Sequence, residues 1–296
     1  MMKKPIFTGS SVAIITPFDS QGNIDYEEFG RFIEFQLENK IDSITVGATT
    51  GEGSTLSDEE HREIIRYCVE KVNHRVPVIA GTGSNDTGYA LDLSLFACEV
   101  GADALLLVTP YYNKTTQAGL IKHYSYIADR VSKPVLAYNV PSRTGMHCTA
   151  ETYFELSKHP NINGVKEASG DFSMIAKTRH LCGDDFYIWS GNDDQIVPLL
   201  SLGGQGVISV FANIAPRVSH DIVDFYVNGK VKESSDLQIR YIDLIENLFK
   251  EVNPIPVKTA VRLIGFNPGT FRMPLCEMGE KNFIAMQNAM KDVGLI

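Results

Sequence analysis

Short apolar segments recur along the chain at a spacing of roughly 20–35 residues, and a helical pattern follows each of them. The segments are Ser11–Ile15, Ser43–Gly47, Val76–Ala80, Ala104–Thr109, Val135–Asn139, Asn163–Lys166, Phe186–Ser190 and Gly206–Val210. Several are apolar throughout instead of alternating, which is typical of parallel strands that are buried on both faces. Eight such strand–helix units, joined by right-handed crossovers, predict an α/β fold of the (β/α)8 or TIM barrel type.

A tail of roughly 70 residues follows the eighth helix, which we expect to begin near Pro216. Helical patterns in this tail cover Leu237–Val252, Val257–Ile264 and Glu280–Met290. The tail has no cluster of residue types that carry out catalysis, so we expect it to pack on the barrel and to shape an oligomer contact. We therefore divide the chain into a barrel domain, residues 1–228, and a C-terminal helical extension, residues 229–296.

The composition narrows the class of protein and its partners. The chain has 27 Lys and Arg against 36 Asp and Glu, a net charge of −9, which argues against nucleic acid or an anionic membrane as the main partner. Its five cysteines are widely spaced and form no C-x-x-C pair, so we expect reduced thiols and a cytoplasmic location. The first apolar run breaks at Pro17, and neither a signal peptide nor a membrane span is expected.

Lys166 is the first candidate for a chemical role, because active sites of such barrels lie at the C-terminal ends of the strands. Strand alternation predicts that Ile162, Gly164 and Lys166 share one face while Val165 takes the other. Lys166 would then point into the barrel, above a glycine that leaves space for its stem. Loss of hydration favours the neutral amine, which can attack a carbonyl group to form a Schiff base. The alternative is a solvated lysine at a strand end.

Two further features lie at the same end of the predicted barrel. Tyr138 has the matching height on the preceding strand, where its hydroxyl could transfer protons to and from a carbinolamine or enamine. The alternative is a core aromatic residue whose hydroxyl bonds a backbone group. The loop Gly47–Ser54 offers glycine turns, backbone N–H groups and the hydroxyls of Thr49 and Thr50, which together could hold a small carboxylate.

Other signals in the sequence fail or have ordinary explanations. The glycine-rich stretch Gly81–Gly88 follows a predicted strand, but its third glycine comes two places too late for a dinucleotide fingerprint. The histidines show no H-E-x-x-H or paired spacing, so no metal site is predicted. Asp193 and Asp194 follow the seventh predicted strand, and we expect them to cap the next helix.

Six motifs, taken together and in order, make the sequence recognisable over essentially its whole length. They are Gly47–Gly51 (GATTG), Thr109–Asn113 (TPYYN), Tyr138–Gly145 (YNVPSRTG), Gly164–Gly170 (GVKEASG), Ser190–Asp194 (SGNDD) and Asn253–Ala260 (NPIPVKTA). In these motifs the chain resembles the dihydrodipicolinate (4-hydroxy-tetrahydrodipicolinate) synthase family. That family belongs to the pyruvate-dependent class I aldolases, which include N-acetylneuraminate lyase.

The resemblance implies a lyase that condenses pyruvate with L-aspartate 4-semialdehyde in diaminopimelate and lysine biosynthesis. Lys166 would form the Schiff base with pyruvate. Tyr138 would donate and accept protons in a relay with Thr49 and with Tyr112, which would reach the site from the other subunit of a tight dimer. Because the lysine itself supplies the electron sink, no metal or organic cofactor is expected. The resemblance also implies a homotetramer built as a dimer of tight dimers.

The resemblance assigns four further residues to substrate binding. Thr50 would hold the pyruvate carboxylate, largely through its backbone, and Ile208 and Gly191 would line the same pocket. Arg143 would bind the carboxylate of aspartate 4-semialdehyde, a task that suits a bidentate guanidinium.

Two other functions remain as alternatives. A sister aldolase acting on N-acetylneuraminate or 2-keto-3-deoxygluconate would share Lys166 and Tyr138, but sugar-acid enzymes generally lack an arginine matching Arg143. A non-catalytic binding barrel is the other, and the intact catalytic groups argue against it.

The sequence departs from its lysine-inhibited relatives at one position of a cleft at the dimer interface. Those relatives use an acidic residue there to bind the amino group of the effector, and this chain has Tyr89. Asp58 stands where such enzymes often have histidine. Because a charge-assisted contact is lost, we predict that feedback inhibition by lysine is weak or absent.

Overall fold

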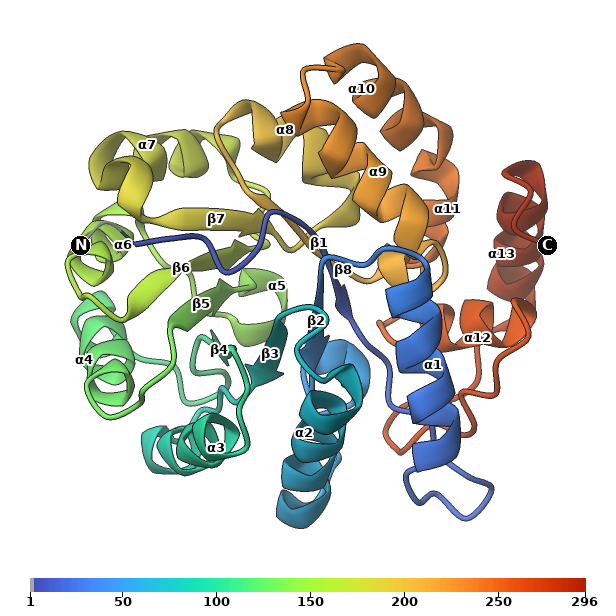
Figure 1. Ribbon diagram of the computed structural model, residues 1–296, viewed down its shortest axis with the longest axis horizontal. Helices are drawn as coiled ribbons and strands as arrows, with labels where there is room; N and C mark the ends of the chain where they lie inside the picture. The colour runs from blue at the N-terminus through green and yellow to red at the C-terminus, as the bar shows by residue number, and fades with distance from the viewer. Residues whose placement is uncertain (1–2) are drawn as a thin grey trace.

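Eight parallel strands close into a barrel, each paired with its neighbours in chain order and β1 with β8 (Figure 1). The strands are β1 (Gly9–Ala13), β2 (Ser43–Val46), β3 (Val78–Gly81), β4 (Ala104–Val108), β5 (Val135–Asn139), β6 (Ile162–Glu167), β7 (Tyr187–Ser190) and β8 (Gly206–Ser209). The structure is a computed structural model that describes residues 3–296. It confirms the predicted (β/α)8 barrel, with strand boundaries within two residues of the predicted ones.

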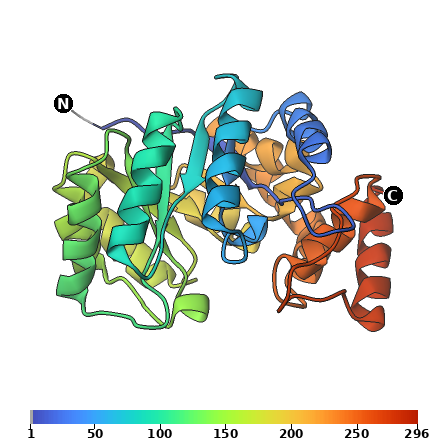
Figure 2. The same cartoon turned by 90° about the horizontal axis from the view of Figure 1, so that it is seen from below.

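Helices surround the barrel and continue beyond it (Figures 1 and 2). Those between the strands are α1 (Tyr26–Glu38), α2 (Asp58–Val72), α3 (Thr87–Glu99), α4 (Gln117–Ala128), α5 (Pro141–Thr144), α6 (Ala150–Ser157), α7 (Phe172–Cys182) and α8 (Ile196–Ser201). After β8 come α9 (Pro216–Val227), α10 (Val231–Arg240), α11 (Ile242–Asn247), α12 (Ile255–Leu263) and α13 (Glu280–Asp292). Within residues 3–296, no helix has the length and apolar character that crossing a membrane requires.

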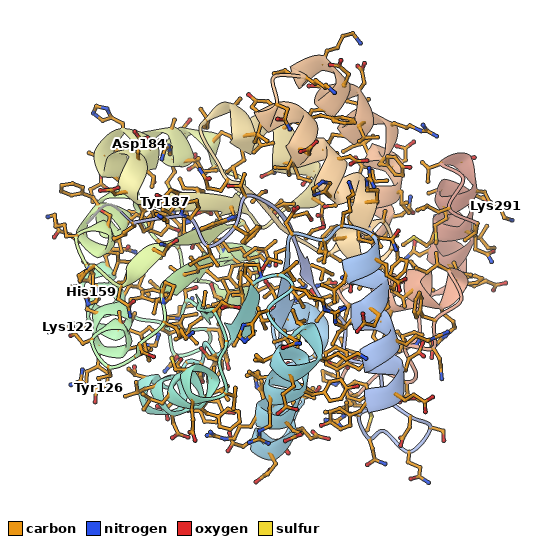
Figure 3. All side chains as sticks on the ribbon, viewed as in Figure 1. Lys122, Tyr126, His159, Asp184, Tyr187 and Lys291 are labelled. Atoms are coloured by element: carbon orange, nitrogen blue, oxygen red, sulfur yellow. The ribbon has the colours of Figure 1, made fainter. Side chains whose placement is uncertain are left out.

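The outer faces of these helices carry many polar side chains, with single apolar ones among them. Lys122 on α4 and Lys291 on α13 illustrate the polar side chains, since they are exposed and point away from the body of the molecule (Figure 3). Helix ends are fixed by local hydrogen bonds, as at α2. There the Ser57 hydroxyl accepts from the Glu60 N–H, and the Glu60 carboxylate accepts from the Ser57 N–H, which forms a capping box. This box sets where α2 begins after the β2 loop.

The strands bury one set of side chains in the barrel interior and the other set beneath the helices. The interior set includes Leu136, Tyr138, Trp189 and Ile208. The outer set packs with apolar helix residues and includes Val12, Val46, Leu105, Leu107, Ala137 and Val165. Both faces of the strands are therefore apolar, which explains why several strand sequences do not alternate.

One predicted feature of β6 is wrong. Ile162 pairs with Val135, but the next pairing joins Gly164 to Leu136, so the register shifts by one residue at Asn163. This bulge turns Ile162 outward into the same layer as Val165, instead of inward with Lys166. Gly164 also serves a purpose other than the predicted one, because a Cβ atom there would lie 2.0 Å from the backbone oxygen of Tyr187 on β7.

Candidate active site

Lys166 lies near the C-terminal end of β6 and points into the barrel. In the register of the sheet it pairs with Tyr138 on β5 and with Trp189 on β7, both of which belong to the interior cluster. Only 4% of Lys166 is exposed, and its Nζ atom lies 4.4 Å from the centre of the Tyr138 ring. The predicted matching height of Lys166 and Tyr138 on adjacent strands is confirmed.

The surroundings of Lys166 favour its neutral form. Burial lowers the pKa of Lys166 to about 8, and the guanidinium of Arg143 adds to the fall while the carboxylate of Asp193 opposes it. Roughly a tenth of the amine is therefore unprotonated at pH 7, far more than for an ordinary lysine, and this neutral form is the one that can attack a carbonyl group.

Gly191, in the loop after β7, makes room for the lysine side chain. A Cβ atom at this position would lie 3.1 Å from Lys166 Cε and 2.7 Å from Ala168 Cβ. The Gly191 N–H also donates to the Glu167 carbonyl oxygen at 2.8 Å, which ties the loop to β6. A larger residue would push on the stem of Lys166.

Tyr138 is held in its neutral form. Burial raises the pKa of Tyr138 to about 12, although Arg143 and a hydrogen bond with the Thr49 side chain oppose the rise. A neutral phenol can donate a proton and, once ionised, take one back, so Tyr138 beside the Lys166 amine suits proton transfer during imine chemistry.

The loop after β2 carries Thr49 and Thr50 on a short 3-10 turn, η1 (Thr49–Gly51). Gly47 has a φ of 69° and begins the turn in the left-handed region, which a glycine adopts without strain. Thr50 is 3% exposed, and its hydroxyl oxygen accepts from the Asn253 side-chain amide at 3.0 Å. With that lone pair occupied, the Thr50 hydroxyl hydrogen remains available for an acceptor such as a carboxylate.

Arg143 lies on α5, the short helix that follows β5. Its Nη2 atom donates to the Asn253 carbonyl oxygen at 3.2 Å, and the side chain is otherwise exposed. The neighbouring Thr144 fixes the turn, because its hydroxyl bonds the backbone oxygens of Val140 and Met146. The guanidinium thus has a defined position with donors left for an anionic ligand.

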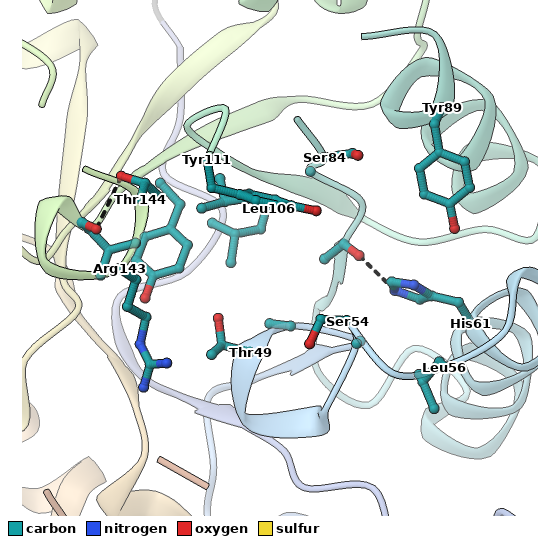
Figure 4. A pocket seen from close by; sticks show the side chains of 18 residues that line it. Thr49, Ser54, Leu56, His61, Ser84, Tyr89, Leu106, Tyr111, Arg143 and Thr144 are labelled. Atoms are coloured by element: carbon teal, nitrogen blue, oxygen red, sulfur yellow. Dashed lines mark hydrogen bonds between the residues drawn. The ribbon is translucent and has the colours of Figure 1, made fainter. Parts of the chain in front are cut away.

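Thr49 and Arg143 lie at one end of a cavity of about 380 Å³ at the mouth of the barrel (Figure 4), which Tyr138 also lines. His61 and Tyr89 line the other end, so both ends share one continuous space. Not every predicted site residue lines it. Lys166, Thr50, Ile208 and Gly191 lie outside this cavity lining, and Lys166 meets it through the ring of Tyr138.

Tyr112 stands apart from the other predicted residues. It is 91% exposed, does not line the cavity and has a φ of 69° in the loop between β4 and α4. Its neighbour Tyr111 lines the cavity instead. The geometry of one chain therefore does not bring Tyr112 to Lys166, and its assignment to the site of a second subunit remains a prediction.

Asp193 does not behave as predicted. Its buried carboxylate accepts from the Ser209 hydroxyl at 2.5 Å and from the N–H groups of Val210 and Phe211 at 3.0 Å each. The expected cap of the following helix is wrong, since neither η3 (Asp193–Gln195) nor α8 has a side-chain cap. Instead, the carboxylate accepts from N–H groups of the turn after β8 that have no partner in the sheet. It also lies close enough to Lys166 to raise the pKa of that lysine.

Two more residues of the site escaped prediction. Glu167 is buried next to Lys166 in sequence, and its carboxylate accepts from the Tyr153 hydroxyl at 2.7 Å and from the Asn139 amide. Burial raises the pKa of Glu167 above its ordinary value. Asn253 contacts both Thr50 and Arg143, although it belongs to the extension, for which we expected packing on the barrel and an oligomer contact. Both residues lie inside motifs noted in the sequence, but no local pattern indicates what they contact.

Comparisons with known proteins agree with this geometry. A model described as the dihydrodipicolinate synthetase family matches residues 6–293. A 4-hydroxy-tetrahydrodipicolinate synthase from Caldicellulosiruptor saccharolyticus is 54% identical over 291 residues, which covers 98% of both chains. The dihydrodipicolinate synthase structure from Thermotoga maritima has a TM-score of 0.96 at 40% identity and covers 99% of this chain and 100% of its own.

A further similar structure, from Cyanidioschyzon merolae, was solved with lysine bound. It has a TM-score of 0.96 at 38% identity and covers 99% of this chain and 100% of its own. The family match extends over almost the whole sequence, and the relatives share both the barrel and the extension. The chain belongs to the dihydrodipicolinate synthetase family.

Proposed function

We propose that this enzyme is a 4-hydroxy-tetrahydrodipicolinate synthase, a lyase that condenses pyruvate with L-aspartate 4-semialdehyde. The observation that carries the proposal is Lys166, a buried lysine of lowered pKa beside Tyr138 at the catalytic end of the barrel. The names of relatives such as the 54% identical synthase favour this reaction over sugar-acid cleavage. The product would serve diaminopimelate and lysine biosynthesis.

The reaction begins with attack of the neutral Lys166 amine on the pyruvate carbonyl carbon. Loss of water gives the imine, and loss of a methyl proton gives the enamine. The enamine carbon attacks the aldehyde carbon of the second substrate, whose oxygen takes up a proton. The amino group of the condensed product then attacks the imine carbon, which closes the ring and releases Lys166 as a free amine.

Proton transfers in this scheme pass through Tyr138. Its neutral hydroxyl lies beside the amine, and the Thr49 side chain connects to it. Tyr112 would complete the relay from the other subunit of a tight dimer, which makes the dimer the smallest active form. The exposed position of Tyr112 in the single chain is compatible with that arrangement, and a tetramer of two such dimers is our expectation.

Substrate carboxylates would bind at two places. Thr50 would hold the pyruvate carboxylate through its backbone and hydroxyl, with Ile208 and Gly191 forming the walls. Arg143 would bind the carboxylate of aspartate 4-semialdehyde in the cavity that it lines. No metal or organic cofactor enters the scheme, since the protonated imine accepts the electron pair.

The test of the function is a comparison of substrates. Purified enzyme is assayed with pyruvate plus aspartate 4-semialdehyde, and separately for cleavage of N-acetylneuraminate and 2-keto-3-deoxygluconate. We expect turnover only with the first pair. In Arg143→Ala the KM for the aldehyde should rise by roughly tenfold or more, while pyruvate binding changes little. Cleavage of a sugar acid at a comparable rate would overturn the assignment.

Two expectations from the sequence stay predictions. We propose a cytoplasmic location, which agrees with the kind of reaction. The division into a barrel of residues 1–228 and an extension of residues 229–296 also stays a prediction. The contacts of Asn253 support an extension that works as one unit with the barrel.

A further inference from the structure

A fully buried ion pair joins the extension to the loop that carries Thr49 and Thr50. Lys258 on α12 places its Nζ atom 2.7 Å from Glu52 Oε1, and both side chains are 0% exposed. The reaction scheme uses neither residue. A buried ion pair contributes little to stability by itself, because the loss of hydration offsets much of the attraction. Stability alone therefore does not explain this pair.

Glu52 is attached directly to the catalytic loop. It follows Gly51 at the end of η1, and its N–H donates to the Thr49 carbonyl oxygen at 3.1 Å. Its φ is 55°, in the left-handed region that favours glycine. The chain nevertheless has a glutamate here, and both carboxylate oxygens are used, since Oε2 accepts from the Arg272 N–H at 3.2 Å.

Lys258 is equally constrained on its side of the pair. Besides Glu52, its ammonium donates to the Thr270 carbonyl oxygen at 2.8 Å. It also lies 4.5 Å from the centre of the Phe18 ring and 5.1 Å from that of Phe271. The ammonium is therefore fixed by several partners, and it links α12 firmly to Glu52.

The extension and the segment just after β1 hold this loop and the start of α2 at three further points. The Asn253 amide donates to the Thr50 hydroxyl, as described above. From the other side, the Thr16 hydroxyl donates to the Gly51 carbonyl oxygen at 2.7 Å. Arg272 also reaches past Glu52 to pair with Glu60 at the start of α2. Turn η1 is thus held between Thr16, just after β1, and the extension.

We propose that Glu52 and Lys258 are positioning residues for pyruvate binding. Their ion pair fixes the turn Thr49–Gly51, so that the Thr50 backbone and hydroxyl face the substrate carboxylate and Thr49 faces Tyr138. This inference rests on the proposed function. It makes α12, far along the chain from the barrel strands, a structural part of the pyruvate site.

The experiment measures pyruvate binding through reductive trapping of Lys166 with borohydride. The pyruvate concentration that gives half-maximal trapping is determined for the unaltered enzyme, Glu52→Gln and the double variant Glu52→Gln/Lys258→Met. The double variant removes both buried charges, so it should fold more stably than the single variant. We expect half-saturation to rise by roughly tenfold in both, and the KM for pyruvate to rise by more than kcat falls.

Asp42→Asn is the matched control. Asp42 accepts from His220 and from the Ser10 N–H near the start of β1, at the other end of the barrel. This change should lower the melting temperature without altering half-saturation by pyruvate.

The outcomes separate the positioning role from simple stabilisation. If the double variant recovers both its melting temperature and the unaltered half-saturation, the pair only stabilises the fold and the inference is wrong. If the unaltered enzyme itself is not trapped by pyruvate, the proposed function fails instead. Raised half-saturation in the double variant, with a recovered melting temperature, supports the positioning role.

Discussion

Two lysines of this enzyme are buried to a similar degree but meet opposite surroundings. Lys258 lies against a carboxylate at 2.7 Å and a carbonyl oxygen at 2.8 Å. Lys166 takes part in none of the ion pairs found among residues 3–296, and its Nζ atom lies over the ring of Tyr138. Burial lowers the pKa of both, and a carboxylate opposes the fall in each case, but Asp193 acts on Lys166 only through its charge, whereas Glu52 also accepts a hydrogen bond from Lys258.

The difference shows how one residue type serves two purposes. A buried ammonium with a full set of partners stays charged and fixes the elements around it. A buried amine without a carboxylate in contact gives up its proton more easily and becomes a nucleophile. Burial alone therefore does not identify a catalytic lysine, and the surrounding partners decide its role.

The largest effect is expected from Lys166→Ala. Without the amine no imine forms, so kcat/KM should fall by at least about 10⁴-fold. Steady-state kinetics with both substrates measures the loss, and circular dichroism checks that the fold is kept. Residual activity within tenfold of the unaltered enzyme would show that the reaction does not depend on this residue.

Replacing each of the two lysines by methionine should change the free energy of unfolding in opposite directions. Lys258→Met leaves Glu52 buried without its cation and should lower the free energy of unfolding by about 3–5 kcal/mol. Lys166→Met removes a buried positive charge that is unfavourable in the folded state. Because the folded pKa of about 8 lies below the unfolded value, protonation of Lys166 below pH 8 costs stability, by about 3 kcal/mol, and this cost disappears above the unfolded pKa.

Urea unfolding at pH 7 measures both changes. We expect an unchanged or higher free energy of unfolding for Lys166→Met, in contrast to Lys258→Met. Equal losses in the two variants would contradict the distinction between a partnered and an unpartnered lysine.

Inhibition by free lysine depends on the same factor, the presence of a carboxylate beside an ammonium group, at the far end of the cavity. Tyr89 lines this end and offers no carboxylate of its own, and the nearby Asp58 already pairs with Arg62. We therefore expect weak or absent inhibition by lysine. Tyr89→Glu should lower the half-inhibitory concentration by roughly tenfold, the effect of one charge-assisted hydrogen bond.

A lysine titration of the unaltered enzyme and of Tyr89→Glu checks this expectation. Strong inhibition of the unaltered enzyme at low lysine concentration would refute it.

The smallest effect concerns the charge near Lys166. Trapping by pyruvate should become faster as the pH rises through about 8, the midpoint of the profile, and level off above it, because only the neutral amine attacks. The Asp193 carboxylate raises the pKa of Lys166, so Asp193→Asn should move the midpoint of this profile to lower pH. Asp194→Asn is the matched control and should leave the midpoint in place. A shift to higher pH in Asp193→Asn would contradict the electrostatic argument.

Much of the fold could be predicted from the sequence, because buried parallel strands are short, apolar segments that recur at a regular spacing. The orientation of Lys166 and its pairing with Tyr138 also followed from strand position. Ile162 was misplaced because alternation assumes a regular strand, and the bulge at Asn163 breaks the alternation without any local signal.

The contacts between residues far apart in the sequence could not be predicted at the site. Asn253 reaches Thr50 across 203 positions of sequence, and Lys258 reaches Glu52 across 206. Such pairs depend on where the extension returns to the barrel, which helical periodicity does not encode. Asp193 was likewise assigned to the nearest helix, although the unpaired N–H groups that it binds lie on the following strand–helix unit.

Reductive trapping tests the central claim most directly. The enzyme is treated with borohydride in the presence of pyruvate, digested and examined by peptide mass spectrometry, with Lys166→Ala in parallel. The account predicts a single pyruvate-derived adduct on the peptide that contains Lys166, and none in the variant. An adduct on Lys258 or elsewhere, or no adduct on the unaltered enzyme, would contradict it.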